Sequence, residues 1–276
     1  LAVSQGDLPL SAQRLQRISG IRSGDPYTSR TLVDLYSRFQ DSGYFDSIQI
    51  QPKIDARDDS RVPIDIELTP APRHSWRLGV GARSDTGPRA SADYTNRRLN
   101  TRGDRLHAQL TLSPALSELG GDYRFAIGDH QRESYTARFG AQHEVTDSST
   151  SDLASLGVAY STLGSALTRV LSLDLSYETS SLGGDDLESW QLVPGAAWTW
   201  RSGRAQDSGA AAVRAHATVK GSDPLLLSDT RFLYLTGGVK TRLPLGPRQR
   251  LILRLDSGAV LTEDFDDLPV SYRFFA

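Results

Sequence analysis

Five histidines and three short acidic stretches are the side chains of this chain that could hold a metal ion or transfer a proton. No two histidines have the His-x-x-x-His or His-Glu-x-x-His spacing that places two zinc ligands on one helix face. The sequence contains no cysteine, so it has neither a disulfide framework nor a thiolate metal site. A Gly-x-Ser-x-Gly nucleophile elbow is also missing. The histidines are His74, His107, His130, His143 and His216.

The acidic stretches are DARDD from Asp55, GGDDLE from Gly183 and TEDFDD from Thr262. None has the Asp-x-Asp-x-Asp-Gly spacing of a calcium loop. The first lies in a polar turn and the other two lie in expected loops, so we interpret all three as solvated charge. We therefore expect no catalytic, cofactor-binding or metal-binding residue, and a protein that is not an enzyme.

Composition excludes two further classes. The 276 residues include 31 basic and 33 acidic ones, and a net charge of -2 gives no attraction to nucleic acid. No apolar run approaches the roughly 18 residues of a membrane helix, which excludes a helical membrane protein. The mean hydropathy of -0.38 does not exclude a membrane barrel, because barrel strands only alternate and the lumen is polar.

The first 72 residues mix helical and strand patterns. Apolar residues at helical spacing predict one helix over 10–18 and a second between Pro26 and Gly43, where Gly43 can take the left-handed position that ends a helix. Alternation then predicts two strands, in FDSIQIQPKI and in VPIDIEL. We interpret residues 1–72 as a small α+β domain whose first strand precedes Leu1.

From Ser75 onward the helical period disappears and about eleven segments alternate with period two. In the seventh, for example, Leu171, Leu173 and Leu175 alternate with polar residues. The expected strands are 75–83, 88–97, 104–113, 120–128, 133–144, 152–161, 167–178, 188–200, 209–220, 230–243 and 249–261. Consecutive strands without helices to cover them favour an antiparallel up-and-down barrel.

The polar faces of these strands carry too much charge for a packed protein core, where each unpaired ion costs several kcal/mol. A wet lumen accepts them, so we expect the apolar faces to contact lipid. The expected lumen residues are Arg77, Arg83, Asp93, His107, Gln109, Arg124, Arg138, Asp174, Arg214, His216, Arg254 and Asp256. The expected aromatic girdle is Tyr94, Tyr135, Trp190, Trp198 and Trp200, with Phe232 and Tyr234 assigned either there or to the lumen. A large soluble all-β domain is the alternative.

The segment GDPYTSRTLVDLYSRFQDSGYFDSIQIQP, running into VPIDIELTPAPRHSWRLGVGARSDTGPR, resembles a last POTRA domain passing into a barrel. This is the architecture of the outer-membrane protein assembly superfamily, to which BamA, TamA and the two-partner secretion transporters belong. Within that superfamily the chain looks most like TamA. The resemblance is strong to Ser113 and rests on pattern beyond it.

The resemblance implies that residues 1–72 are a POTRA domain in the periplasm and that the full protein has three such domains. It also implies a sixteen-strand barrel in the outer membrane, of which about eleven strands lie in residues 73–276. Arg273, Phe274 and Phe275 look like the start of the sixth extracellular loop. We expect that these strands alone do not close. The resemblance further implies clients that are unfolded outer-membrane or autotransporter proteins, and a TamB-like partner that spans the periplasm.

The family helps other barrel proteins enter the membrane, which implies weak pairing between the first and last barrel strands, called the seam. We assign its first-strand side to Trp76, Leu78, Gly79, Val80 and Gly81. Glycines pack little and cost ordering entropy in a strand. The alternative is that Gly79 and Gly81 only relieve crowding or face another backbone. In the POTRA domain, the strand edge over 47–53 is a candidate binding site.

Gly43, Tyr44 and Phe45 are interpreted as structural residues that end the helix and fill the small core. Two other function classes stay open beside an assembly factor. One is a barrel that carries an N-terminal patatin-like lipase, and the other is a passive diffusion porin, which would not need a POTRA domain.

Overall fold

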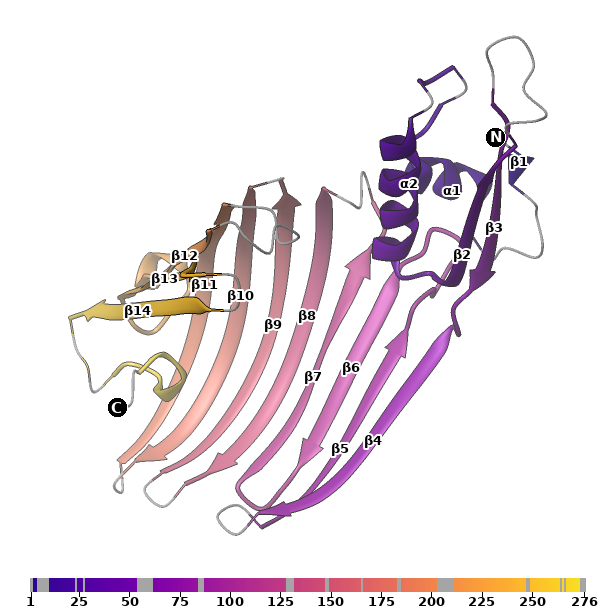
Figure 1. The fold of residues 1–276 in the computed structure, drawn as a ribbon. Helices are drawn as coiled ribbons and strands as arrows, with labels where there is room; N and C mark the ends of the chain where they lie inside the picture. Colours follow the sequence, from indigo (N-terminus) through magenta and orange to yellow (C-terminus); the bar gives the residue numbers. More distant parts are fainter. Residues whose placement is uncertain are drawn as a thin grey trace. The chain divides into compact units, whose positions relative to one another are not determined.

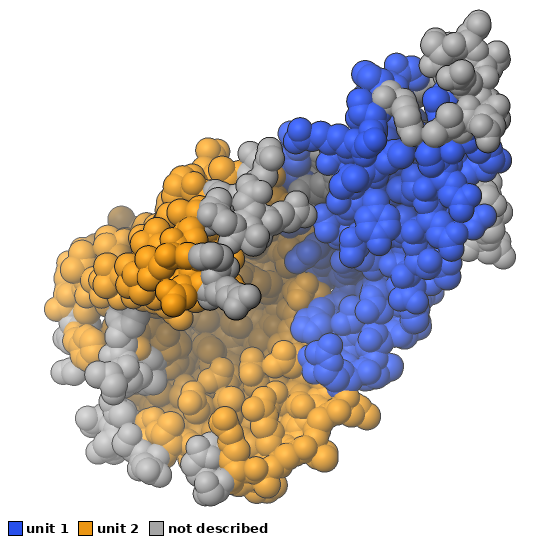
Figure 2. Space-filling model, viewed as in Figure 1, with its two compact units in different colours: residues 1–77, 93–108, 123–134 blue, residues 78–92, 109–122, 135–276 orange. Residues whose placement is uncertain are grey.

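The computed structural model divides into two compact units, which Figure 2 colours blue and orange. The first comprises Leu1–Arg77, Asp93–Ala108 and Tyr123–Ser134, and the second Leu78–Ala92, Gln109–Asp122 and Tyr135–Ala276. The structure describes residues 2–3, 10–22, 24–26, 28–53, 62–83, 87–127, 132–146, 149–164, 166–182, 185–202, 211–246, 249–263, 265 and 267–273.

The N-terminal elements form the expected α+β arrangement. They are β1 (Ala2–Val3), α1 (Ala12–Ser19), α2 (Ser29–Ser42), β2 (Phe45–Pro52) and β3 (Ile64–Pro70). The sheet order is β1-β3-β2, with β2 antiparallel to β3. The expectation that the first strand precedes Leu1 is corrected here, because Ala2 and Val3 pair in parallel with β3.

Both helices begin and end at residues whose local chemistry explains the boundary. The Ser11 hydroxyl accepts from the N–H of Arg14 and starts α1, and the Thr28 hydroxyl accepts from Thr31 and starts α2. Gly43 ends α2 with a φ of 63°, a left-handed conformation that glycine adopts without a steric penalty. The helices cover a small core whose buried apolar members are Leu10, Leu15, Ile18, Leu35, Phe39, Tyr44, Phe45 and Ile66.

Eleven strands form the second sheet, in the order β14-β13-β12-β11-β10-β9-β8-β7-β6-β5-β4 (Figure 1). Each strand neighbours the next in sequence, which confirms the up-and-down barrel wall. The strands are β4 (His74–Arg83), β5 (Gly87–Asn96), β6 (Arg105–Leu112), β7 (Leu116–Phe125), β8 (Glu133–Val145), β9 (Ser149–Leu163), β10 (Leu167–Leu182), β11 (Asp185–Ser202), β12 (Ala212–Ser222), β13 (Phe232–Pro244) and β14 (Arg250–Thr262).

The fourth of these strands begins four residues earlier than expected. Pro114 and Ala115 form a two-residue turn, in which the N–H of Ser113 donates to the carbonyl oxygen of Leu116 at 2.9 Å. The short turn lets β7 start at Leu116 instead of near residue 120. Sequence alternation misses this boundary because the turn uses neither the Asn-Gly nor the Asp-Gly pair typical of tight hairpins.

The two faces of the sheet differ as expected. On one face the leucines of β10 and the tryptophans of β11 are exposed. On the other face ionisable side chains meet across strands: Arg138 contacts Asp174 at 2.7 Å, and His216 lies 3.8 Å from Asp256. The polar face is therefore paired and wet, which suits a lumen better than a protein core.

Phe232 and Tyr234, left open between girdle and lumen, belong to the polar face. Register pairs Tyr234 with Lys220, and Phe232 is buried against the ring of Tyr272 with ring centres 4.5 Å apart. Two short 3-10 helices, η2 (Pro224–Leu226) and η3 (Val270–Tyr272), complete the described elements. Within the described residues, no helix has the length and apolar character needed to cross a membrane.

Candidate functional site

The first barrel strand, β4, lies at one end of the eleven-stranded order. It pairs with β5 on one side, and the described residues place no strand on its other side. Trp76, Leu78 and Val80 project from it and are 66, 76 and 92% exposed. An edge strand presents unpaired N–H and C=O groups on which another strand can assemble. β4 and β14 are the two ends of the described sheet, and the assignment of β4 as a gate strand stays a prediction.

The glycines of β4 differ in the space around them. A Cβ placed on Gly81 would meet no atom within 4 Å, whereas one on Gly79 would lie 2.7 Å from the hydroxyl oxygen of Ser91, a small group that can rotate. No backbone atom lies close enough to either added Cβ to require glycine there. In the described residues crowding therefore does not explain Gly81, and a low packing energy for this strand remains the physical consequence of both glycines.

Tyr44 connects the α+β part of the first unit with the turn between β5 and β6. Its hydroxyl donates to the carbonyl oxygen of Gly103 at 2.6 Å and accepts from Arg14 at 3.3 Å. The guanidinium of Arg105 lies 4.5 Å from the centre of the Tyr44 ring. Sequence reasoning assigned Tyr44 to core filling and missed this junction; the basic run NRRLNTRGDR was the signal available.

Gly43 and Phe45 lie on either side of Tyr44. Gly43 sets the backbone conformation, and Phe45 packs in the core. Gly43 carries the left-handed turn after α2, and a Cβ there would lie 3.2 Å from the Arg105 guanidinium. Phe45 is buried and meets the ring of Phe39 edge to face at 5.6 Å. The three residues thus carry the chain from α2 into β2 while aiming Tyr44 at the β5–β6 turn.

Asp104 organises that turn. Its carboxylate accepts from the backbone N–H of Ala126 at 2.7 Å, the hydroxyl of Tyr123 at 2.8 Å and the amide of Asn100 at 2.7 Å. Burial raises the pKa of Asp104, but the hydrogen bonds to its charged form outweigh burial and leave the pKa below its ordinary value.

The predicted start of the sixth loop folds against the polar face within the second unit. Leu268 is fully buried, Tyr272 stacks near Phe232, and the Ser271 hydroxyl donates to Glu178 at 2.6 Å. Burial, followed by the negative charge of Asp174, raises the pKa of Tyr272 to about 12. Arg273 donates to the carbonyl oxygen of Leu268 at 2.7 Å, while Phe274 and Phe275 lie outside the described residues.

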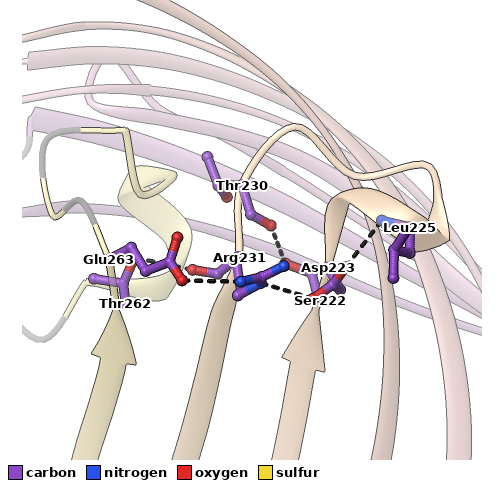
Figure 3. Close-up of polar contacts among 7 residues, drawn as sticks. All are labelled: Ser222, Asp223, Leu225, Thr230, Arg231, Thr262 and Glu263. Carbon is purple, nitrogen blue, oxygen red and sulfur yellow. Dashed lines mark hydrogen bonds and ion pairs between the residues drawn. The ribbon is translucent and has the colours of Figure 1, made fainter.

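An ion-paired bridge closes the loop between β12 and β13 (Figure 3). Arg231 donates to Asp223 at 2.7 Å and to Glu263 at 2.9 Å, which ties this loop to the end of β14. The N–H of Leu225 and the Arg231 guanidinium, both donors to Asp223, lower its pKa against a smaller opposing effect of burial. Glu263 belongs to the stretch TEDFDD, so one member of that acidic run is paired.

No group of described His, Asp or Glu residues is arranged to hold a metal ion.

The POTRA-like part also has a free strand edge. In the order β1-β3-β2, β2 pairs with β3 on one side only within the described residues. The predicted binding edge, residues 47–53, covers most of β2. Lys53 at its end contacts Asp65 of β3 at 2.5 Å.

Comparison with known proteins follows this division of the chain. Residues 3–71 match the POTRA family model, described as a surface antigen variable number repeat. BamA from Haemophilus ducreyi, in a crystal structure lacking POTRA domains 1–3, matches 97% of this chain with a TM-score of 0.70 and 12% identity. Residues 3–71 are a POTRA domain, and the chain shares the fold of BamA.

Two further solved structures match the POTRA domain together with the barrel wall. CdiB from Acinetobacter baumannii matches 95% of the chain with a TM-score of 0.59 and 10% identity. CdiB from Escherichia coli matches 92% with a TM-score of 0.56 and 13% identity. The chain covers 56, 52 and 52% of the BamA and the two CdiB structures, so it spans about half their length.

Proposed function

We propose that this chain is part of an outer-membrane assembly and translocation factor. The factor helps β-barrel or autotransporter proteins enter the membrane through a lateral seam of its barrel. The order of a POTRA domain followed by a barrel wall supports this role, as does the fold it shares with BamA and CdiB. The proposed factor acts by templating and not by catalysis.

The single observation that carries the proposal is the order along the chain: a POTRA domain over residues 3–71 is followed by an antiparallel sheet in which β4 is an end strand. An unfolded client has strands whose N–H and C=O groups must be paired before they can reside in hydrocarbon, where each unpaired group costs several kcal/mol. A β4 edge that is open in the full barrel, even briefly, offers those partners by strand addition. Gly79 and Gly81 lower the cost of opening, because they contribute little packing to whatever strand closes on β4.

The difference between the two faces of the sheet supports the proposed placement. The proposed barrel lies in the outer membrane with its leucine and tryptophan face toward lipid, and the POTRA domain lies in the periplasm. Its proposed partners are unfolded outer-membrane or autotransporter clients, which use the β2 edge or the β4 edge, and a TamB-like protein that spans the periplasm.

A photo-crosslinking experiment tests the templating role. A benzophenone amino acid replaces Val80 on β4 in the full-length protein, and in a matched variant it replaces Leu173 on β10. Leu173 is also exposed on the apolar face but lies in a strand paired on both sides. During client assembly, Val80 is expected to yield client adducts and Leu173 to yield none above background.

Equal adduct yields from both positions would indicate contact with the lipid-facing wall in general and would overturn the seam. Client assembly that proceeds at its normal rate without any Val80 adduct would overturn it as well.

A further inference from the structure

Three arginines meet where β4 begins and β5 ends. Arg73 directly precedes β4, and Arg97 and Arg98 follow the last residue of β5. The backbone N–H of Arg97 donates to the carbonyl oxygen of Arg73 at 2.9 Å, so the two residues are side by side. Each guanidinium donates to one backbone carbonyl oxygen, at 2.9, 3.1 and 2.8 Å respectively. We call Arg73, Arg97 and Arg98 the arginine cluster.

Within the part of the chain that the structure describes, the positive charge of the arginine cluster has no counter-charge. Among the described residues no carboxylate forms an ion pair with any of its members. Arg98 is only 8% exposed, and its Nε and one terminal nitrogen have no hydrogen-bond partner. Burial, then the charges of Arg73 and Arg97, lower the pKa of Arg98. A buried cation without an anionic partner costs several kcal/mol, so an anion at this place would stabilise the protein.

Two aromatic rings mark the depth of the arginine cluster relative to the proposed membrane. Trp76 and Tyr94 lie on neighbouring strands with ring centres 4.4 Å apart, each three residues from an arginine of the cluster. Three strand residues rise roughly 10 Å along the strand, which is roughly 7 Å along the membrane normal for a strand tilted by about 45°. Aromatic girdles lie at the edge of the apolar band, and the headgroup layer extends roughly 5–8 Å beyond it. Long arginine side chains one such step outside the girdle therefore reach the level of lipid phosphates.

We propose that the arginine cluster binds the phosphate of an anionic phospholipid in the periplasmic leaflet, beside the first barrel strand. Planar guanidinium groups donate paired hydrogen bonds that match phosphate oxygens. Arg73 and Arg97 contact the phosphate, and Arg98 adds positive charge behind them. The inference rests on the proposed membrane placement and adds a lipid to the set of partners. A lipid bound here lies at the N-terminal end of β4, the strand that is proposed to form the seam.

Trp76 is a built-in reporter for this site. In the full-length protein every other tryptophan is replaced by phenylalanine, and the protein is reconstituted in phosphatidylcholine vesicles. Two vesicle preparations are compared, one with brominated phosphatidylglycerol and one with the same fraction of brominated phosphatidylcholine. Brominated acyl chains quench the fluorescence of nearby tryptophans. Brominated phosphatidylglycerol is expected to quench Trp76 at least twice as strongly, and added salt is expected to reduce the excess.

The variant Arg73→Gln/Arg97→Gln is expected to abolish the excess quenching. The matched control, Arg22→Gln/Arg30→Gln, removes the same charge from exposed positions of the POTRA domain and is expected to retain it. Equal quenching by both brominated lipids in the unmodified cluster would overturn the lipid site alone. Absence of quenching by either lipid would instead overturn the membrane placement. Loss of the excess on adding inorganic phosphate, at a concentration where sodium chloride of equal ionic strength has no effect, would assign the cluster to free phosphate and overturn a lipid ligand.

Discussion

The hydroxyl of Tyr44 donates a 2.6 Å hydrogen bond to the carbonyl oxygen of Gly103, 59 residues further along the chain. Gly103 has a φ of 88°, and a Cβ at this position would lie 2.6 Å from the same hydroxyl oxygen. Glycine therefore meets both a conformational and a steric requirement here. The contact joins the end of helix α2 to the turn between β5 and β6, and the POTRA domain and this turn belong to one compact unit.

The change Tyr44→Phe keeps the ring that packs under Arg105 and removes only the hydroxyl. It leaves the buried carbonyl oxygen of Gly103 without its donor, which costs about 1–3 kcal/mol. We predict that amide hydrogen exchange in the turn over 97–104 becomes about tenfold faster, as expected for about 1.4 kcal/mol.

Tyr36→Phe is the matched control, because Tyr36 lies exposed on the same helix α2. It is expected to leave exchange in the turn unchanged. Wild-type exchange rates in the Tyr44→Phe protein would show that the hydrogen bond does not hold the turn.

Asp104 is expected to make the same turn sensitive to acid. Its folded pKa is lowered by the three hydrogen bonds to its carboxylate, despite the opposing effect of burial. A lowered folded pKa adds stability that is complete above the unfolded value of about 4 and is lost as the pH falls through the folded pKa.

We predict that hydrogen exchange in the turn, corrected for its intrinsic pH dependence, accelerates as the pH is lowered below about 4. Asp104→Asn should be less protected at pH 7, by about 1–3 kcal/mol for the lost charged hydrogen bonds, and should lack this acid transition. An unchanged acid transition in Asp104→Asn would assign it to another group.

The parts of the fold that could be predicted from the sequence are those with local causes. The period-two leucines of β10 mark one face because a strand alternates residue by residue, and Gly43 marks a helix end because its conformation is local. The start of β7 and the short strand β1 were missed. The Pro-Ala turn before β7 is a weak sequence signal for a hairpin, and the two residues of β1 are too few to show an alternating pattern.

The candidate site divides in the same way. The gate strand is a prediction from the family resemblance and from the glycines of β4, whereas the partners of Tyr44 and the arginine cluster depend on contacts between residues distant in sequence. Pairing of Arg73 with Arg97 requires the register of β4 and β5, which alternation alone leaves undetermined. Phe232 was ambiguous for a similar reason, since its place is decided by the segment that covers it.

Lys240 is expected to destabilise the sheet in which it lies. Register places it directly opposite Arg214 on β12 and Arg254 on β14. Like charges in cross-strand pairs are unfavourable, and opposite charges favourable, by up to about 1 kcal/mol before screening by salt. We predict that Lys240→Glu raises the urea midpoint of the reconstituted full-length protein, and more so at low salt.

Lys220→Glu provides the comparison. Lys220 faces the same side of the sheet, but its register partners are Gly195 and Tyr234, neither of which is a basic residue. A midpoint for Lys240→Glu that equals that of Lys220→Glu would contradict the proposed repulsion.

Phe232 is expected to anchor the start of the sixth loop. Replacing it with alanine removes the ring that Tyr272 stacks on, and a buried Phe→Ala change costs about 3–5 kcal/mol. We predict faster tryptic cleavage after Arg273 in the folded full-length protein.

The neighbouring change Leu233→Ala is the control, because Leu233 projects from the opposite face of the same strand and is more exposed. It should leave the cleavage rate near that of the wild type. Equal acceleration by both changes would point to a general loosening of β13.

The proposed seam is tested most directly by locking it. In the full-length protein, which needs no native cysteine removed from this region, a cysteine at Val80 is paired with one in the strand that closes the barrel. A control protein carries Ser172→Cys and Gly195→Cys, register partners on β10 and β11 that are already joined within the wall. We predict that oxidation abolishes client assembly only in the seam-locked protein and that reduction restores it. Undiminished client assembly by the oxidised, seam-locked protein would contradict the account.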